Sequence, residues 1–254
     1  MSTIVVRPLR FTDNIDAMQA FLEILGLRPR VEAEAGGWVD MVAGGGMVAL
    51  HSVVTSTTGA KPGQTSLGFE ADELTALAKQ LVEGGLDGVA VYDEAYGQVL
   101  TCPDPLGDEI HVDGRSGDLY GYRVHPLVQP SSLRVSPVRF TDPQGPYCDF
   151  LEALGLTRRG ESNEYYVTYA AADGDHGLVG LHYVYAEELP VVEKPGAATV
   201  QLTFQTTEAL EDVARRLADS GFEAPITREE FGSFVTVTDP DGQEVQIHEA
   251  PLHE

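Results

Sequence analysis

Cysteine is scarce in this sequence, with only Cys102 and Cys148 among 254 residues. The two lie far apart in the chain and suggest no disulfide framework, so we expect a protein of the reducing cytosol. No apolar run approaches the roughly 20 residues that a membrane-spanning helix needs. The segment that begins at Met1 is too short for a signal-peptide core and lacks its basic flank. We therefore expect a cytoplasmic location.

Positive charge is also scarce: 16 lysines and arginines stand against 40 acidic residues, which gives a formal net charge of −24. A field of this sign repels nucleic acid and anionic membranes, because both are bound through Lys and Arg. It permits a cationic ligand, although an acidic surface commonly serves solvation alone. The 43% of hydrophobic residues predicts a globular protein with a sizeable core, which we expect to bind neither nucleic acid nor membrane.

The sequence contains an internal repeat. Residues 8–13 (PLRFTD) recur as residues 137–142 (PVRFTD), and residues 21–27 (FLEILGL) recur as residues 150–156 (FLEALGL). An Asp-Pro-x-Gly segment begins at Asp104 and again at Asp239, in the same order within the repeat. The shared order indicates duplication. We predict two domains, 1–116 and 131–254, joined by a Gly- and Pro-containing linker over residues 117–130.

Each half reads as two similar modules of one strand, one helix and three strands. In the first, residues 5–11 are apolar and β-branched, which predicts a strand, and Asp13 is a candidate helix cap. The apolar spacing from Met18 to Leu25 predicts a helix that ends at Gly26. Strands are expected near residues 28–33, 37–42 and 47–53, with a glycine hairpin turn at 44–46. The second module repeats this order from residue 66, with Asp72 as its helix cap and strands near 88–92, 98–102 and 109–112.

Two motifs carry a family resemblance. A strand that ends in Asp, followed by a helix that ends Phe-Leu-x-x-Leu-Gly-Leu, resembles the opening of glyoxalase and vicinal-oxygen-chelate proteins. The Asp-Pro-x-Gly turn before Glu-Ile-His-Val or Glu-Val-Gln-Ile resembles their closing hairpin. The chain is identified as a tandem two-domain member of the glyoxalase/bleomycin resistance protein/dioxygenase superfamily. The resemblance implies an α+β fold in which four βαβββ modules form rolled mixed-sheet cups with helices outside, and the cup is the expected ligand site.

The resemblance also implies up to four metal ligands on the cup strands, of the His, Gln or Glu type. Counted from the strand-ending Asp, the first position falls on Val6 and Val135, which cannot coordinate a metal. The remaining positions are Leu50 or His51, Ser66 and His111 in the first half, and Leu181 or His182, Gln201 and Gln246 in the second. A site within one half or across both would include a valine. We therefore expect no catalytic metal, and a divalent metal held by a substituted ligand set is the alternative.

Other residues at matched places in the repeat are expected to line the cups. Strand alternation from the first metal position puts Arg10 and Arg139 on the ligand side, and the alternative for both is a structural ion pair across the barrel. Aromatic side chains in matched pairs offer stacking surfaces, or else ordinary core packing. His111 alternates with Glu109 and Asp113 and is expected to face the cup, whereas His51 and His182 are ligand residues or capped strand-end histidines. The predicted ligand-binding residues are Arg10, Trp38, His51, Tyr96, His111, Arg139, Tyr166, His182, Gln201, Phe231 and Gln246.

The function expected from these observations is binding of a small organic molecule, an antibiotic or an aromatic metabolite, without metal chemistry. The alternative is an enzyme: a metal-dependent lyase, isomerase or dioxygenase of the same superfamily with a substituted ligand set, or a metal-free acid–base catalyst that uses His111. A third reading is a degenerate scaffold that has lost its ligand. Since a fused duplicate can satisfy the pairing of single-repeat relatives within one chain, we expect a monomer or a weak homodimer.

Overall fold

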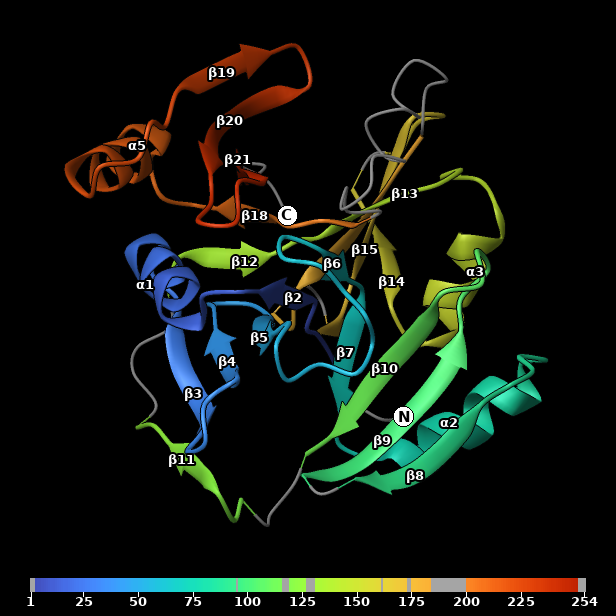
Figure 1. Cartoon of the computed structure of the whole chain (residues 1–254). Coiled ribbons are helices and arrows are strands. Elements are labelled where there is room, and N and C mark those ends of the chain that lie inside the picture. The colour runs from blue at the N-terminus through green and yellow to red at the C-terminus, as the bar shows by residue number, and fades with distance from the viewer. Residues whose placement is uncertain are drawn as a thin grey trace.

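The computed structural model describes residues 3–94, 96–115, 119–126, 131–160, 162–172, 175–183 and 200–250 (Figure 1). The elements of the first half are β1 (Ile4–Val6), β2 (Leu9–Thr12), α1 (Ile15–Leu25), β3 (Arg28–Ala33), β4 (Trp38–Val42), β5 (Met47–Ser52), β6 (Thr65–Ser66), β7 (Gly68–Ala71), α2 (Leu74–Glu83), β8 (Ala90–Glu94), β9 (Gly97–Pro103), β10 (Glu109–Gly114) and β11 (Tyr122–Val124). Those of the second half are β12 (Leu133–Val135), β13 (Val138–Phe140), α3 (Pro146–Ala153), β14 (Thr157–Arg159), β15 (Tyr166–Ala170), β16 (Leu178–His182), β17 (Val200–Gln201), β18 (Thr203–Thr206), α5 (Leu210–Asp219), β19 (Ile226–Glu229), β20 (Gly232–Thr238) and β21 (Glu244–Glu249).

Two sheets make up each half, as the expected α+β fold of four βαβββ modules requires. The first half contains the orders β1-β7-β10-β9-β8 and β11-β3-β4-β5-β2-β6, and the second β12-β18-β21-β20-β19 and β14-β15-β16-β13-β17. The first strand of each half is interrupted at Pro8 or Pro137, where the missing backbone N–H breaks the ladder. As a result β1 pairs with β7 in one sheet, while β2 pairs with β5 and β6 in the other. This split strand joins the two sheets, so each cup forms within one half.

The N-terminal cap positions of α1 and α2 lie one residue after the predicted ones. The side chain of Asn14, not Asp13, accepts a hydrogen bond from the Ala17 N–H at 3.0 Å, and Gly26 ends α1 in the left-handed conformation as predicted. Asp72 accepts a hydrogen bond from the backbone N–H of Thr3 at 2.7 Å, and Glu73 holds the position before α2. Asp72 therefore ties the start of the chain to the second module instead of capping the helix.

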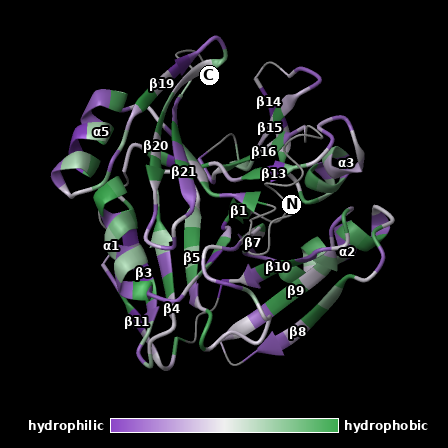
Figure 2. Ribbon diagram, turned by 45° about the horizontal axis from the view of Figure 1, so that its top comes forward, coloured by the Kyte–Doolittle hydropathy of each residue, from purple (hydrophilic) through white to green (hydrophobic). Residues whose placement is uncertain are grey.

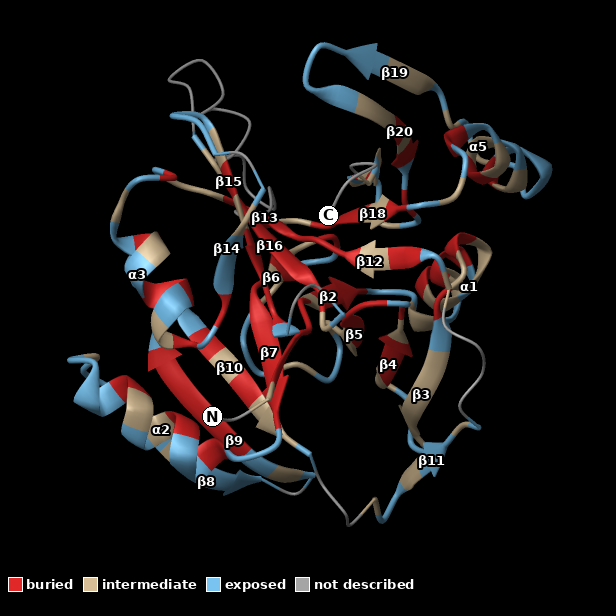
Figure 3. Ribbon diagram, turned by 180° about the vertical axis from the view of Figure 1, so that it is seen from behind, coloured by how far each residue is buried: buried red, intermediate tan, exposed pale blue. Residues whose placement is uncertain are grey.

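The helices pack in pairs that come from different halves. The rings of Phe21 on α1 and Phe222 after α5 lie 5.2 Å apart, and Arg216 Nε donates to the Ile24 carbonyl at 2.7 Å. On the opposite side, Gln80 Nε2 of α2 donates to the Ala153 carbonyl at the end of α3 at 2.7 Å. Figure 2 shows these pairs on the two outer sides of the sheets. The buried strands form one continuous core, whereas β8 and β19 at the sheet edges are largely exposed (Figure 3).

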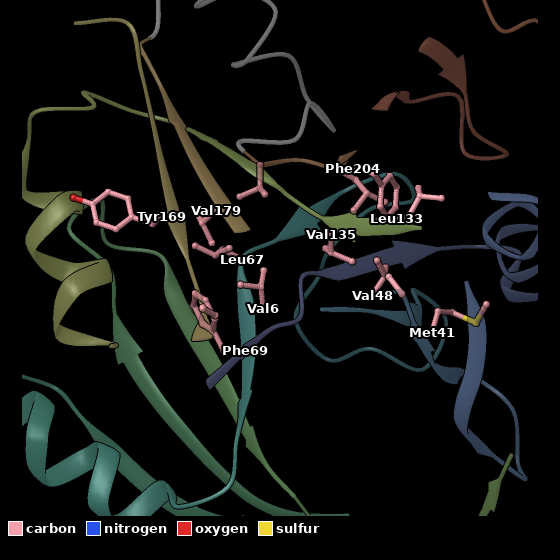
Figure 4. Close-up of a cluster of buried hydrophobic side chains, with 14 of the residues drawn as sticks. Val6, Met41, Val48, Leu67, Phe69, Leu133, Val135, Tyr169, Val179 and Phe204 are labelled. Carbon is pink, nitrogen blue, oxygen red and sulfur yellow. The ribbon is translucent and has the colours of Figure 1, made fainter. Parts of the chain in front are cut away.

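At the centre of the molecule, a turn of each half forms hydrogen bonds with the first strand of the other half. The glycine turn between β4 and β5 forms as predicted, and Gly44 N also donates to the Leu133 carbonyl at 2.8 Å while Val135 N donates to the Gly45 carbonyl at 2.8 Å. The matched contact runs from Val6 N to the His176 carbonyl at 2.8 Å. Val6 and Val135 are therefore buried in the apolar core between the halves (Figure 4), and do not face a cup.

Part of the segment that was predicted to be a linker forms a strand in a sheet of the first half. Strand β11 pairs with β3, with Tyr122 opposite Ala33, and His125 Nε2 lies 2.9 Å from the Glu32 carboxylate. Residues 116–118 and 127–130 of the same segment lie outside the described residues. Among the helices that the structure describes, none is long and apolar enough to cross a membrane.

Candidate functional site

A cavity of about 420 Å³ opens between the two sheets of the first half. It is lined by β2, β4, β7 and β10, by Arg7 and Ser66 at the strand breaks, and by residues 58–60 of the loop after β5. The side chains of β2 that line the cavity are Leu9 and Phe11. The cup of the first half is thus a cavity of the size that proteins commonly use for small molecules.

One wall of the cavity is aromatic. His51 pairs with Phe11 on one side and with Trp38 on the other, and its ring lies 5.8 Å and 5.3 Å from theirs. Leu50, the neighbouring residue, is fully buried on the helix side of the sheet. The structure thereby fixes the facing that the sequence left open, with His51 on the cup side. Burial lowers the pKa of His51, so its ring is neutral at pH 7.

An ion-pair network centred on Arg7 borders the same cavity next to Trp38. Its Nε and Nη2 donate to Asp40 Oδ1 at 2.9 and 2.7 Å, and its Nη1 donates to Asp113. Burial alone would lower the pKa of Arg7, but Asp40 and Asp113 outweigh it and leave the pKa raised. The Arg7 guanidinium also lies 5.1 Å from the Trp38 ring centroid. Arg7 is therefore permanently charged and already engaged with two carboxylates.

A second guanidinium extends the network. Arg30 Nη2 bridges Asp40 at 3.0 Å and Glu70 at 2.5 Å, and Arg115 Nε donates to Glu70 at 3.1 Å. Burial would raise the pKa of Glu70, but Arg30 outweighs it, so this pKa is lowered. The site residues predicted from the sequence did not include Arg7, Arg30, Asp40 and Glu70. The signal was present for Asp40, which follows Trp38 by two positions on the same strand and so shares its face.

His111 lies at the mouth of the cavity together with its neighbours on β10. Its Nε2 lies 3.0 Å from Glu109 Oε1, and Asp113 follows on the same face. Tyr96 lies in the turn before β9 and is 41% exposed. Burial, and then the negative charge of Asp113, raise the pKa of Tyr96, which keeps its phenol protonated.

Arg10 and Arg139 face away from the cups, which favours the ion-pair alternative for both. Arg10 donates to Asp239 and, at 2.9 Å, to Thr65 Oγ1; Arg139 Nη2 donates to Asp104 at 3.0 Å. Each aspartate opens the Asp-Pro-x-Gly turn of the opposite half. Strand alternation does place Arg10 on the same side as Val6, but that side faces the core. Counting back from the strand-ending Asp had therefore selected the wrong face of the strand.

The second half carries residues matched to those around the first cup. The His182 ring lies 5.8 Å from Phe140 and 6.0 Å from Tyr166, and a Cβ on Gly180 would come within 2.4 Å of the Tyr166 hydroxyl. Gln246 Nε2 donates to Glu244 Oε1 at 2.8 Å, and Gln201 Nε2 donates to the same atom at 3.4 Å. Phe231 is 78% exposed and stacks on Phe234 at 6.2 Å, so it lies at the rim.

Comparison with known proteins now decides the family. Residues 139–247 match the family model described as Glyoxalase/Bleomycin resistance protein/Dioxygenase superfamily. This half is a glyoxalase-superfamily domain. No curated protein matches the chain in sequence.

Solved structures of glyoxalase-superfamily folds match the chain over nearly its whole length. The Mn(II)-bound glyoxalase from Novosphingobium aromaticivorans matches with a TM-score of 0.63 at 15% identity, over 98% of this chain and 83% of that one. The 2,2',3-trihydroxybiphenyl 1,2-dioxygenase from Sphingomonas wittichii gives 0.60 at 14% identity, over 98% and 91%. Homoprotocatechuate 2,3-dioxygenase from Arthrobacter globiformis gives 0.59 at 13%, over 98% and 80%. At these identities the likeness establishes the glyoxalase-superfamily fold of both halves, and the fold alone.

The donor set of this protein does not fit a catalytic metal. The residue opposite Ser66 on the cavity side is Leu9, not Val6, and the residue opposite Gln201 is Val138, not Val135. Both corrected positions are again aliphatic. His111 is the only imidazole among the described residues that line the cavity, because His51 packs against Phe11 and Trp38 without lining it, whereas a catalytic site usually has three protein ligands. Within the described residues no group of three His, Cys, Asp or Glu side chains could hold a metal ion.

Two partly buried histidines predict a pH dependence of stability. Burial lowers the pKa of His51 in the first half and of His248 in the second. The unfolded chain therefore binds protons that the folded chain does not, so the free energy of unfolding should fall as the pH drops below about 6.5. We expect urea unfolding between pH 7.5 and pH 5.5 to show this decrease, and a His51→Gln/His248→Gln variant to show a flatter profile. An equally steep profile in the variant would contradict the assignment.

Proposed function

We propose that the first half of this protein binds a small organic molecule with a planar or aromatic ring, an antibiotic or an aromatic metabolite, without metal chemistry. The observation that carries the proposal is the cavity of about 420 Å³, which is lined by Trp38 and Phe11 and bordered by the Arg7 network. A tryptophan face gives a planar ligand a large contact area at little entropic cost, and a few fixed polar groups then orient it.

The alternative of a metal-dependent lyase, isomerase or dioxygenase is not supported by the donor set at Leu9, Ser66 and His111. A metal-free acid–base catalyst has one contact in its favour, the 3.0 Å approach of His111 Nε2 to Glu109. A carboxylate partner orients an imidazole and stabilises its charged form, as general catalysis requires. The two candidates separate in a His111→Gln variant, since catalysis would lose turnover while ligand binding near Trp38 would persist.

Trp38 is the single tryptophan of the chain, so its fluorescence reports directly on the cavity. We expect saturable quenching or a spectral shift of Trp38 when the protein is titrated with members of a panel of one- and two-ring aromatic compounds. A Ser66→Phe variant should lose at least tenfold in affinity, because the new ring fills the cavity. The matched Gln201→Phe variant changes the equivalent position in the second half and should leave the titration unchanged.

Two results would contradict the proposal. The first is that no compound of the panel changes the Trp38 signal. The second is that Ser66→Phe, shown to be folded by its melting temperature, binds as well as the parent protein. The expected monomer or weak homodimer remains a prediction that light scattering can check.

A further inference from the structure

The charges around the cavity constrain the chemical class of the ligand, an inference that rests on the proposed binding function. We propose that the first-half cavity selects aromatic ligands that carry a protonated amine over equivalent ligands that carry a carboxylate.

Arg7 is the only arginine or lysine among the described side chains that line the cavity, and its charge is already matched. It donates through three of its nitrogens to Asp40 and Asp113, and its side chain is only 7% exposed. A ligand carboxylate would have to displace one of these buried partners or approach while both remain in place. Either arrangement makes binding unfavourable, because a buried carboxylate without a partner is strongly destabilising. Arg7 is therefore a poor anchor for an anion.

The carboxylates at the mouth, in contrast, have acceptor capacity left. Glu109 uses Oε1 toward His111, and Asp113 uses Oδ2 toward Arg7, while their other oxygens accept no hydrogen bond from any described residue. The Glu109 side chain is 66% exposed and reaches water at the rim. An ammonium group placed beside either side chain would form a charge-assisted hydrogen bond with it.

The carboxylates around the cavity outnumber the guanidiniums, which also favours a cationic ligand. Four carboxylates, those of Asp40, Glu70, Glu109 and Asp113, surround the three guanidiniums of Arg7, Arg30 and Arg115. A cationic ligand compensates the excess negative charge, whereas an anionic ligand adds to it. The chain as a whole carries a formal charge of −24, so the long-range field also attracts a cation.

The aromatic wall supplies the other half of the recognition. Trp38 and Phe11 line the same cavity as Glu109 and Asp113, so the ring of a short aralkyl amine can contact the indole while its amine reaches the rim.

Three probes of nearly equal shape test the charge preference: phenethylamine, phenylpropionate and phenethyl alcohol. Each is titrated at neutral pH and low salt while Trp38 fluorescence is recorded. We expect the amine to bind about tenfold or more tightly than the carboxylate, with the alcohol between them. The advantage of the amine should shrink at high salt, because screening weakens the exposed part of the interaction.

Charge variants identify the side chains responsible. Glu109→Gln should weaken the amine several-fold and leave the alcohol unchanged. A Glu109→Gln/Asp113→Asn variant also releases one of the two partners of Arg7, so the carboxylate should then bind as well as the amine or better. The matched control is Glu244→Gln, which removes the charge at the equivalent start of β21 in the second half and should change nothing.

The possible failures are distinguishable. Equal or tighter binding of the carboxylate in the parent protein, or an amine preference that Glu109→Gln does not alter, overturns the charge selection and leaves the binding function intact. If none of the three probes binds while other compounds of the aromatic panel quench Trp38, the proposed ligand class is wrong. If no compound quenches Trp38, the binding function itself is wrong and this inference falls with it.

Discussion

Replacement of Arg10 by Met is expected to lower the free energy of unfolding by about 3–5 kcal/mol, with little effect on binding near Trp38. The Arg10 side chain is 1% exposed, and it pairs with Asp239, which is fully buried in the opposite half. Burial raises the pKa of Asp239 and lowers that of Arg10 in spite of their mutual attraction, so each charge depends on the other. Methionine keeps the apolar stem but leaves an uncompensated carboxylate in the core.

Urea unfolding measures this effect, and two further variants separate its causes. Arg215→Met removes a 67% exposed arginine that pairs with Asp212, and should change stability by no more than about 0.5 kcal/mol. A double Arg10→Met/Asp239→Leu variant should recover only part of the loss, because the buried Asp241, whose Oδ2 lies 3.6 Å from Arg10 Nε, also loses this ion pair. If Arg10→Met were as stable as the parent protein but bound the Trp38 ligand poorly, Arg10 would be a ligand residue, contrary to the geometry.

Gly44→Ala is expected to cost about 3 kcal/mol of stability, through a clash between the halves. A Cβ at this position would lie 2.0 Å from the backbone oxygen of Ser131 and 3.0 Å from that of Leu133. Neither oxygen belongs to a side chain that can rotate away, and the Leu133 oxygen accepts the hydrogen bond from Gly44 N at 2.8 Å. The substituted chain must therefore separate β12 from the hairpin turn.

The control for Gly44→Ala is Gly155→Ala. Gly155 has a φ of +96°, and a Cβ added there would meet no described atom within 4 Å, so alanine adds only backbone strain of about 1–2 kcal/mol. Chemical denaturation of both variants should show the larger loss for Gly44→Ala. A loss at Gly44 no greater than that at Gly155 would show that the contact between the halves can relax at little cost.

Local structure was largely predictable from the sequence, because its signals are local. Strand β3 begins and ends at the predicted residues, and Gly26 ends α1 in the left-handed conformation that its position after Leu25 indicated. The repeat likewise revealed the two halves and their four modules. The cap residues were displaced by one position, since Asp13 and Asn14 are both good caps and only the packing of α1 decides between them.

The facing of the first strand could not be predicted. A strand with polar residues at both Arg7 and Arg10 gives no apolar side to choose, and a one-residue error reverses every side chain. The choice is made by partners distant in sequence: Asp40 and Asp113 hold Arg7 on the cavity side, and Asp239 holds Arg10 on the other. The role of Glu70 could not be predicted for the same reason, because its place in the site depends on an ion pair with Arg30, which lies in another module.

The ion pairs between the halves can form only after the second half of the chain has been synthesised. Arg10 and Asp239 are 229 positions apart, so at about 5–20 residues per second the ribosome makes the second roughly 10–45 seconds after the first. Throughout that interval the Arg10 guanidinium lacks its partner, and the glycine turn at Gly44 stays uncovered until the segment from Ser131 to Leu133 has been made. The nascent first half is therefore an incomplete body with an exposed apolar face around Val6, and we expect it to depend on chaperones until the second half emerges.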